Sequence, residues 1–300
     1  MEKISIIIPI YKGKKYIKQL LKSFQNNFTN LNKSVNLEVI FINDYPQEEI
    51  DKSIINNYDI TKEFDIFFYN NHENIGIHGT RVKGLEYSTG NIIFFLDQDD
   101  QIEDNYLISQ YKALKNNDVV VCNGYQKCGN KKYEIYESRY HMSKAIKLST
   151  YRMWNEIVSP GQCLIRKEVI PQYWKNKIIK NNGSDDYFLW ILLLCNNCKF
   201  VLNNYKLYYH CLTENNFSKN IDKMIESNLV VCDYLKQYNK KTEKLALYQE
   251  KFLQIKIGKK YSIKNNMESI INFPKICFDR MSYSFLKKFY RVVENRKKYK

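Results

Sequence analysis

Hydrophobic residues in the first 125 positions alternate between two periodicities. The run ISIIIPI (residues 4–10) is continuously apolar, and the segment KKYIKQLLKSFQN that follows repeats its apolar side chains at helical spacing. Further β-rich runs occupy residues 38–44, 64–70, 91–97 and 118–125, and a glycine-punctuated helical stretch covers residues 77–88. Near-continuous hydrophobic strands alternating with helices predict an α/β protein with a mostly parallel, Rossmann-like sheet flanked by helices.

Acidic residues stand where two of these predicted strands end. Asp44 closes one strand, and Asp97, Gln98, Asp99 and Asp100 close another. In open parallel sheets, ligands bind beyond the carboxyl ends of the strands. The sequence therefore predicts that both acidic groups line one crevice.

The pattern changes after residue 125. Residues 126–218 are mixed, with a Pro-Gly break in SPGQCLIRKEV, a predicted helix at 185–195 and a predicted strand near 200–209. Beyond residue 220 the chain reads as helices rich in Lys, Tyr and Asn. We expect a domain at 1–218, with halves at about 1–125 and 126–218, and a basic helical C-terminal extension at 219–300.

Charge separates the two parts of the chain. The 300 residues carry a formal net charge of +15, and residues 219–300 hold 20 Lys and Arg against 8 Asp and Glu. The basic character therefore belongs to the extension and favours an anionic partner. No zinc-finger, RRM or helix-turn-helix pattern is present, so we expect no nucleic acid.

The apolar runs favour a cytoplasmic protein. The first run contains Pro9 and ends within seven residues, unlike a signal peptide, and FLWILLLC (188–195) is much shorter than the roughly 20 residues that span a bilayer. Eight cysteines suit reduced thiols. Cys195 and Cys198 form one CxxC, which we interpret as two core-facing thiols, the alternatives being a redox pair or half a zinc site.

The Asp97-Gln98-Asp99 triplet has the chemistry of a cation site. In an extended segment the two carboxylates would point the same way and share Mg²⁺ or Mn²⁺, which prefer oxygen ligands. The alternative is a solvated acidic turn, with Asp100 or Asp104 capping the next helix.

Four ordered segments resemble the family 2 glycosyltransferases with the GT-A fold. They are SIIIPIY, VIFIND, NIGIHGTRVKGLEYSTGNIIFFLDQDD (residues 74–100) and GSDDYFLW (residues 183–190), and the resemblance covers roughly residues 4–218. It implies a nucleotide-sugar donor, for which a UDP-sugar is favoured, and a glycan or lipid-linked acceptor. It also implies a divalent metal and a place in cell-surface polysaccharide or glycoconjugate synthesis.

The resemblance assigns donor-binding roles to residues of the first half. Asp44 would lie near the base with Pro9 and Tyr11 beside it, although Asn43 occupies a position that is often Asp. Arg81 would meet the diphosphate, a role that suits its forked donors, unless it is a surface helix residue.

The acidic triplet and the second half supply the remaining roles. Asp97 is expected near the ribose or sugar, Gln98 at the variable middle position, and Asp99 at the metal. Asp186 falls at the catalytic base, with Asp185 where Glu is usual, and the alternative for this pair is capping of the helix that follows. Such a base takes the proton of the attacking hydroxyl, and we expect inversion by single displacement.

His210 is a doubtful metal ligand. In the family a histidine often precedes a serine in a segment like YRxHxxSxS, whereas YYHCLTENNFS places Thr213 in that register and His210 three residues earlier. A structural histidine is the alternative.

The last 18 residues, YSFLKKFYRVVENRKKYK, form an amphipathic pattern. Phe285, Phe289 and Val292 or Val293 fall on one helical face, with most of the lysines and arginines elsewhere. Such a helix can lie on an anionic membrane, which would make the protein peripheral on the inner face of the cell membrane. Packing against the main domain is the alternative.

Two other functions remain open at the level of sequence. A sugar nucleotidyltransferase would need a glycine-rich phosphate loop near the N-terminus, and PIYKGKKY has one glycine. A catalytically silent, membrane-associated binding protein could retain the same fold.

Overall fold

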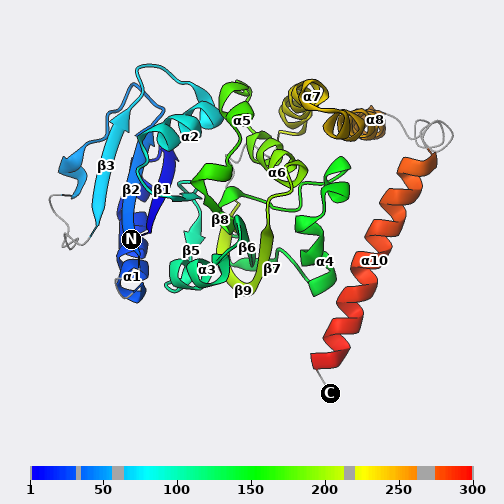
Figure 1. Ribbon diagram of the computed structural model, residues 1–300, viewed down its shortest axis with the longest axis horizontal. Helices are drawn as coiled ribbons and strands as arrows, with labels where there is room; N and C mark the ends of the chain where they lie inside the picture. The colour runs from blue at the N-terminus through cyan, green and yellow to red at the C-terminus, as the bar shows by residue number, and fades with distance from the viewer. Residues whose placement is uncertain (1, 32–34, 56–63, 213–219, 262–273, 299–300) are drawn as a thin grey trace.

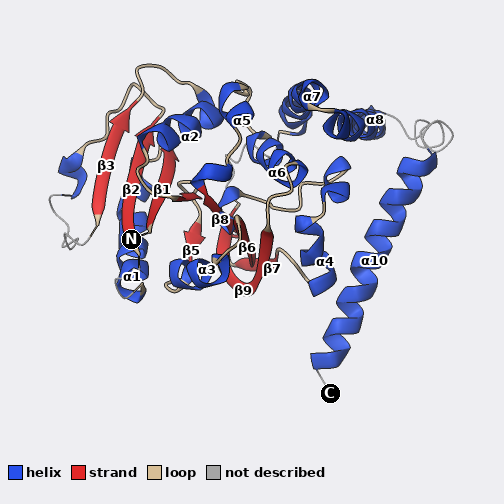
Figure 2. Cartoon of the chain, viewed as in Figure 1, coloured by secondary structure: helices blue, strands red, loops and turns tan. Residues whose placement is uncertain are grey.

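The computed structural model describes residues 2–31, 35–55, 64–212, 220–261 and 274–298, and a nine-stranded sheet runs through it (Figures 1 and 2). The strand order is β3-β2-β1-β4-β8-β6-β9-β5, with β7 paired to β6. The strands are β1 (Lys3–Ile10), β2 (Asn36–Asn43), β3 (Asp65–Asn70), β4 (Ile92–Phe95), β5 (Gln101–Ile102), β6 (Val119–Cys128), β7 (Lys131–Glu134), β8 (Cys163–Arg166) and β9 (Phe200–Cys211).

Helices surround this sheet and continue beyond it. They are α1 (Ile17–Asn30), α2 (Gly76–Tyr87), α3 (Tyr106–Leu114), α4 (Arg139–Ser143), α5 (Gln172–Asn176), α6 (Asp185–Cys195), α7 (Ile221–Tyr238), α8 (Lys240–Tyr261) and α10 (Pro274–Lys298). No helix within the described ranges is long and apolar enough to cross a bilayer.

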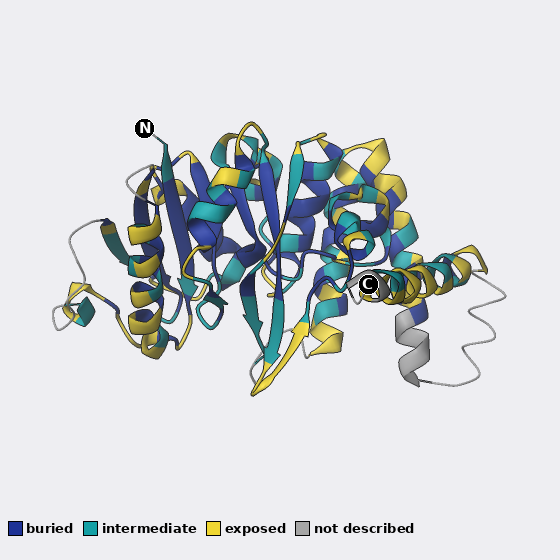
Figure 3. Cartoon of the chain, turned by 90° about the horizontal axis from the view of Figure 1, so that it is seen from below, coloured by how far each residue is buried: buried dark blue, intermediate teal, exposed yellow. Residues whose placement is uncertain are grey.

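The sheet is covered on both faces, as the continuous apolar runs predict. Phe94 and Phe95 are neighbours on β4 and therefore point to opposite faces. Phe94 stacks on Tyr106 of α3, whereas Phe95 packs against Trp174 of α5. Side chains on both faces of β1, β2 and β4 are accordingly buried, as the dark interior in Figure 3 shows.

Strand pairing divides the sheet into two parts. β3, β2, β1 and β4 are all parallel, so their carboxyl ends meet at one edge. Beyond β4 the pairing is mixed, because β8 runs antiparallel to both β4 and β6 while β6 and β9 are parallel. The predicted α/β sheet flanked by helices is confirmed, with its parallel part in the first half of the chain.

One local prediction is wrong. The strand expected at 91–97 ends at Phe95, and residues 97–100 form a turn in which the Asp100 N–H donates to the Asp97 carbonyl over 3.1 Å. Asp97 and Asp99 are therefore not alternate positions of an extended segment. Neither Asp100 nor Asp104 caps α3, whose N-cap position is Asn105.

Helices also form where the extension was expected. α7 packs into the main core through Val231, Cys232 and Leu235, and α7 packs on α8. Phe252 and Ile255 of α8 join Ile276 of α10 in a small second core. The boundary at residue 218 stays a prediction.

Cys195 and Cys198 are free thiols at the end of α6 and just beyond it. Cys195 is buried and contacts the side chain of Asn239, and Cys198 packs against the main core. Burial raises the pKa of Cys198 to about 11. These surroundings fit two packed thiols.

Candidate active site

A cavity of about 520 Å³ opens at the carboxyl ends of β1, β2 and β4 and at the first turn of α6. Nine residues that the sequence singles out all line it: Pro9, Tyr11, Asp44, Arg81, Asp97, Gln98, Asp99, Asp186 and His210. They come from segments up to 200 positions apart in the chain. The topology thus gathers them at the edge where parallel strands end.

An aromatic lip borders the cavity after β1. The rings of Tyr11 and Tyr45 meet edge to face at 5.5 Å, and the Lys12 ammonium lies within 5.5 Å of both ring centroids. The Tyr11 side chain is 47% exposed. An exposed ring with a cation beside it can stack on a planar base and attract an anion.

Gln98 holds this lip in place. Its carboxamide accepts from the Tyr11 N–H at 2.9 Å and donates to the Tyr11 carbonyl at 3.1 Å. Gly13 makes the contact possible, because a Cβ there would lie 1.9 Å from the Gln98 Oε1. Gln98 therefore positions the loop after β1.

Asp44 anchors the start of α2. Its Oδ1 accepts from the Ile75 N–H and the Asn71 amide, and its Oδ2 accepts from the Gly76 N–H, all within 2.9 Å. Gly76 adopts a φ of +78°, which suits glycine. Asn43 does not share this position, because its amide donates to Asn70 and to the carbonyls of Tyr45 and Glu48.

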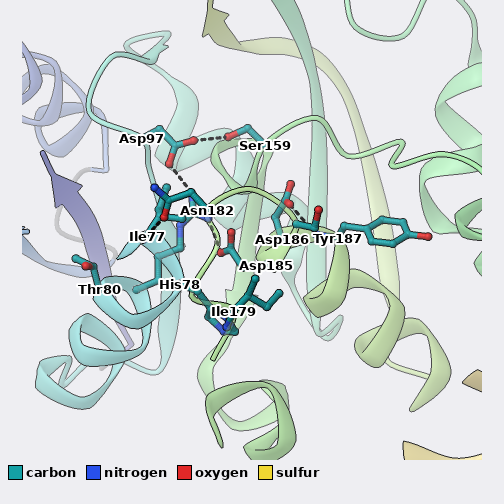
Figure 4. Close-up of polar contacts among 12 residues, drawn as sticks. Ile77, His78, Thr80, Asp97, Ser159, Ile179, Asn182, Asp185, Asp186 and Tyr187 are labelled. Carbon is teal, nitrogen blue, oxygen red and sulfur yellow. Dashed lines mark hydrogen bonds and ion pairs between the residues drawn. The ribbon is translucent and has the colours of Figure 1, made fainter. Parts of the chain in front are cut away.

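Arg81 ties two acidic elements of the cavity together. Its Nη1 donates to Asp185 Oδ2 at 2.6 Å, and its Nη2 pairs with Asp97. The other oxygen of Asp97 accepts from the Ser159 hydroxyl at 3.3 Å, as Figure 4 shows. The side chain of Arg81 is only 4% exposed, so it is not the surface residue of the alternative interpretation.

The turn at residues 97–100 also brings the Asp99 carboxylate to the cavity. Burial, together with the charges of Asp100 and Asp97, raises the pKa of Asp99 to about 6. No described side chain donates a hydrogen bond to Asp99. Asp99 is thus a crowded negative group that a cation would stabilise.

His210 stands beside this turn. Its Nδ1 lies 3.3 Å from the Asp100 carboxylate, which also accepts from the Tyr208 hydroxyl and from the Cys211 N–H. Burial by itself would lower the pKa of His210, but Asp100, Asp97 and Asp99 outweigh it and raise the pKa to about 9. Nδ1 faces Asp100, which leaves Nε2 for the cavity. Thr213 lies outside the described residues.

Asp186 occupies the first turn of α6 with its carboxylate on the cavity. The Asn155 amide donates to Asp186 Oδ2 at 3.1 Å, and the Tyr187 N–H donates to Oδ1 at 2.7 Å. Burial and the charge of Asp185 raise the pKa of Asp186 to about 7, against the opposing effect of Arg81. A carboxylate tuned to this range suits a general base near neutral pH.

The carboxylate oxygens of the cavity fit a hard divalent cation whose other ligands come from the nucleotide-sugar. In the described part of the chain no group of three or more His, Cys, Asp and Glu side chains has metal-binding geometry. Asp99 nevertheless lies next to Asp97 and His210 and accepts no hydrogen bond from any side chain that the structure describes. Mg²⁺ at a diphosphate is usually coordinated by one or two protein carboxylates, and phosphate oxygens and water supply its remaining ligands.

Sequence reasoning missed several residues of this site. Asn155 and Ser159 lie in a loop whose only signal was the Pro-Gly break, yet they contact Asp186 and Asp97. Asn182 accepts from the Ile77 N–H at the start of α2, joining the loop before α6 to that helix. No spacing rule links such distant loops, so the sequence offered no signal for these contacts.

Comparisons with known proteins show which family this chain resembles. Residues 5–174 match the family model described as glycosyl transferase family 2. A putative glycosyltransferase of Bacillus subtilis, EpsH, is 31% identical over 121 residues, which is 40% of this chain and 33% of that protein. A glucosyltransferase of Campylobacter jejuni, named for GalNAc(5)-diNAcBac-PP-undecaprenol, is 28% identical over 102 residues, 34% of this chain and 31% of that protein. The chain spans 15% to 47% of the length of the curated relatives it matches.

Solved structures share the fold. Staphylococcus aureus TarS in complex with UDP-GlcNAc has a TM-score of 0.58 at 18% identity, covering 84% of this chain and 71% of that one. A mannosyltransferase from Pyrobaculum calidifontis with GDP-Man and Mn²⁺ has a TM-score of 0.60 at 13% identity, covering 97% of this chain and 82% of that one. Because the family model matches more than half of its length, the chain belongs to glycosyl transferase family 2 and has the GT-A fold.

Proposed function

We propose that this protein transfers a sugar from a nucleotide-sugar donor to an acceptor hydroxyl, with a divalent metal and with inversion at the anomeric carbon. The observation that carries the proposal is the meeting of Asp44, Asp97, Asp99 and Asp186 in one cavity. Repulsion among these carboxylates is relieved when a cation and its diphosphate lie among them.

The donor fits the side of the cavity nearest β1, β2 and β4. The exposed Tyr11 ring beside Pro9 supplies a surface for the base, with Asp44 at the floor. Asp97 faces the ribose or sugar. Arg81 acts from beneath, since its guanidinium already holds Asp97 and Asp185, and its charge favours a diphosphate above it.

Asp99 would hold Mn²⁺ or Mg²⁺, with Asp97 adjacent and without His210 as a further ligand. Such a cation neutralises the charge that develops on the leaving diphosphate. His210, kept protonated by Asp100, would instead serve as a donor to a phosphate oxygen.

Asp186 is the base of this proposal. It takes the proton of the acceptor hydroxyl while that oxygen bonds to the anomeric carbon and the bond to the diphosphate breaks. Asp185 is buried and engaged by Arg81, so it cannot act as a nucleophile on the opposite face of the sugar. With Asp97 assigned to the sugar and Asp99 to the metal, Asp186 is left to act as a base, which favours a single displacement and hence inversion.

The nucleotidyltransferase alternative is disfavoured by the loop after β1. Its one glycine, Gly13, makes room for the side chain of Gln98 rather than for a phosphate. The silent binding protein is disfavoured by the environment of Asp186, because a purely structural helix cap would not need a second buried carboxylate beside it.

The extension supports a peripheral place at an anionic membrane. On α10, Phe278, Met281, Phe285, Phe289 and Val292 repeat at helical spacing and are 47% to 70% exposed. The two acidic residues of α10, Asp279 and Glu294, are occupied by Arg152 and by the Arg139 N–H. An apolar stripe on a helix with more cations than acidic residues suits anionic lipid, and we place the protein on the inner face of the cell membrane, where polysaccharide and glycoconjugate acceptors are lipid-linked.

The direct test is turnover of defined donors. The purified chain is incubated with UDP-sugars and GDP-sugars in the presence of Mn²⁺ or Mg²⁺, and release of the nucleoside diphosphate is measured. We expect release from a UDP-sugar, abolished by EDTA, and NMR of the sugar product should show the opposite anomeric configuration to the donor. Absence of release from every donor would contradict the proposal.

A further inference from the structure

A second cavity, of about 580 Å³, adjoins the donor cavity on the side of α10. The two cavities share Asn155 and Val158 in their walls. Asn155 is the residue whose amide donates to Asp186. Asn155 therefore connects the wall of the second cavity to the proposed base.

The walls of this second cavity come from four parts of the chain. The β6–β7 hairpin contributes Tyr133 and Glu134, the start of α4 and the residues before it contribute His141 and Glu137, the loop before β8 contributes Trp154 and Glu156, and α10 contributes Tyr283, Ser284 and Lys287. α10 lies outside the segment that matches the family model, which ends at residue 174. This wall is thus a property of the extension.

The wall formed by α10 is held in position. The Tyr140 and Tyr290 rings stack at 4.3 Å, the Arg291 guanidinium pairs with Glu137 at 2.9 Å, and Asp279 pairs with Arg152 at 3.0 Å. Within the cavity, the Tyr283 hydroxyl donates to Glu156. The packed face of α10 is accordingly ordered for binding, opposite its exposed apolar stripe.

The chemistry of the walls fits a neutral sugar. Aromatic rings such as Tyr133, which is 56% exposed, offer flat apolar surfaces to the C–H faces of a pyranose. Carboxylates and amides, including Glu134 and Asn155, accept from and donate to hydroxyl groups. Glu134 pairs with Lys206, Glu137 with Arg291 and Glu156 with His141, and Lys287 is the one lysine or arginine among the described lining residues, so the walls favour a ligand without strong charge.

We propose that this second cavity is the acceptor site, that it binds a neutral sugar unit, and that α10 determines which one. The proposal rests on the proposed function. The attacking hydroxyl passes Asn155 and gives its proton to Asp186, its oxygen bonds to the anomeric carbon of the donor, and the nucleoside diphosphate leaves with the electron pair of the broken bond.

Two variants of the full chain distinguish a change in the proposed acceptor site from a change elsewhere on α10. Ser284 is exposed at the edge of the cavity, so Ser284→Trp adds an indole to its wall, whereas Asn295→Trp adds the same side chain to an exposed position outside the cavity, eleven residues further along the helix. The acceptors are methyl glycosides of glucose, galactose, mannose, N-acetylglucosamine and N-acetylgalactosamine. We expect S284W to raise the acceptor KM about tenfold or more relative to N295W, with the same donor KM in both.

A second readout does not depend on turnover. Trp154 lines the cavity and is partly exposed, whereas Trp174 and Trp190 are fully buried. Methyl glycosides should therefore change the tryptophan emission of the native chain, and Trp154→Phe should remove that change. If methyl glycosides change the tryptophan emission of the native chain but no nucleotide is released from any donor, the sugar-binding site is supported and the proposed function is refuted.

Two results would overturn the inference. One is an equal acceptor KM for S284W and N295W. The other is a native chain that hydrolyses its donor but neither transfers to any of the methyl glycosides nor changes its emission with them.

Discussion

The guanidinium of Arg81 and the carboxylate of Asp185 form a buried ion pair, with Nη1 2.6 Å from Oδ2 and each side chain at most 4% exposed. The pair joins α2 to the first turn of α6, and the second arm of the guanidinium reaches Asp97 after β4. Arg81 thus fixes the two acidic segments of the site relative to each other. Because Asp186 follows Asp185 in the first turn of α6, the ion pair also fixes the position of Asp186.

Removing Arg81 should destabilise the fold strongly. In Arg81→Ala the Asp185 carboxylate stays buried without its partner, and we expect the free energy of unfolding to fall by about 3–5 kcal/mol. Urea denaturation measures this. Glu86→Ala, an exposed change on the same helix, should stay within about 0.5 kcal/mol of the native chain. A loss below about 1 kcal/mol for R81A would show that the pair is not a structural link.

The pH dependence of transfer should report Asp186. The base must be ionised to accept a proton, and burial with the charge of Asp185 raises its pKa to about 7. The rate should therefore rise with pH, with its midpoint near 7, and level off above. Asp186→Asn should lose about 10²–10⁴-fold in kcat and lack this rise.

Asp185→Asn serves as the comparison for that profile. Removing the Asp185 charge takes away one cause of the raised pKa, so the rise should move to lower pH. A profile that is the same in the native chain, D185N and D186N would exclude Asp186 as the base.

The exposed stripe of α10 should bind anionic vesicles. The native chain is expected to sediment with phosphatidylglycerol vesicles, less so at high salt, and not with phosphatidylcholine vesicles. The double variant Phe285→Ser, Phe289→Ser should weaken binding about tenfold or more. Tyr205→Ser, which removes a 72% exposed ring elsewhere on the surface, is the control. Equal binding by all three chains would place the membrane contact elsewhere.

Much of the site could be predicted because the ends of the strands can be recognised in the sequence. Continuous apolar runs locate β1, β2 and β4, and the polar residues that follow them fall at one edge once the strands are parallel. This is why Asp44, Asp97 and Asp99, which follow different strands, share a cavity.

The finer geometry could not be predicted, because it depends on tertiary contacts. The turn at Asp97 replaces the expected extended segment, although the pattern of apolar residues continues through Leu96. The bonds of Gln98 to the Tyr11 backbone and of Asn155 to Asp186 join residues that are 87 and 31 positions apart. The inner face of α10 is likewise set by its partners around Glu137 and Glu156, and the amphipathic pattern left packing against the main domain open without identifying these partners.

The measurement that tests the central claim most directly is donor binding to the Asp99→Ala variant. Titration calorimetry compares the native chain and D99A for the donor that the native chain hydrolyses, with and without Mn²⁺. We expect the native chain to bind the donor at least about tenfold more tightly with Mn²⁺ than without, and D99A to lose that metal dependence while its unfolding stays cooperative. If D99A binds the donor and responds to Mn²⁺ as the native chain does, the carboxylates at this edge of the sheet do not hold a metal and diphosphate, and the account is contradicted.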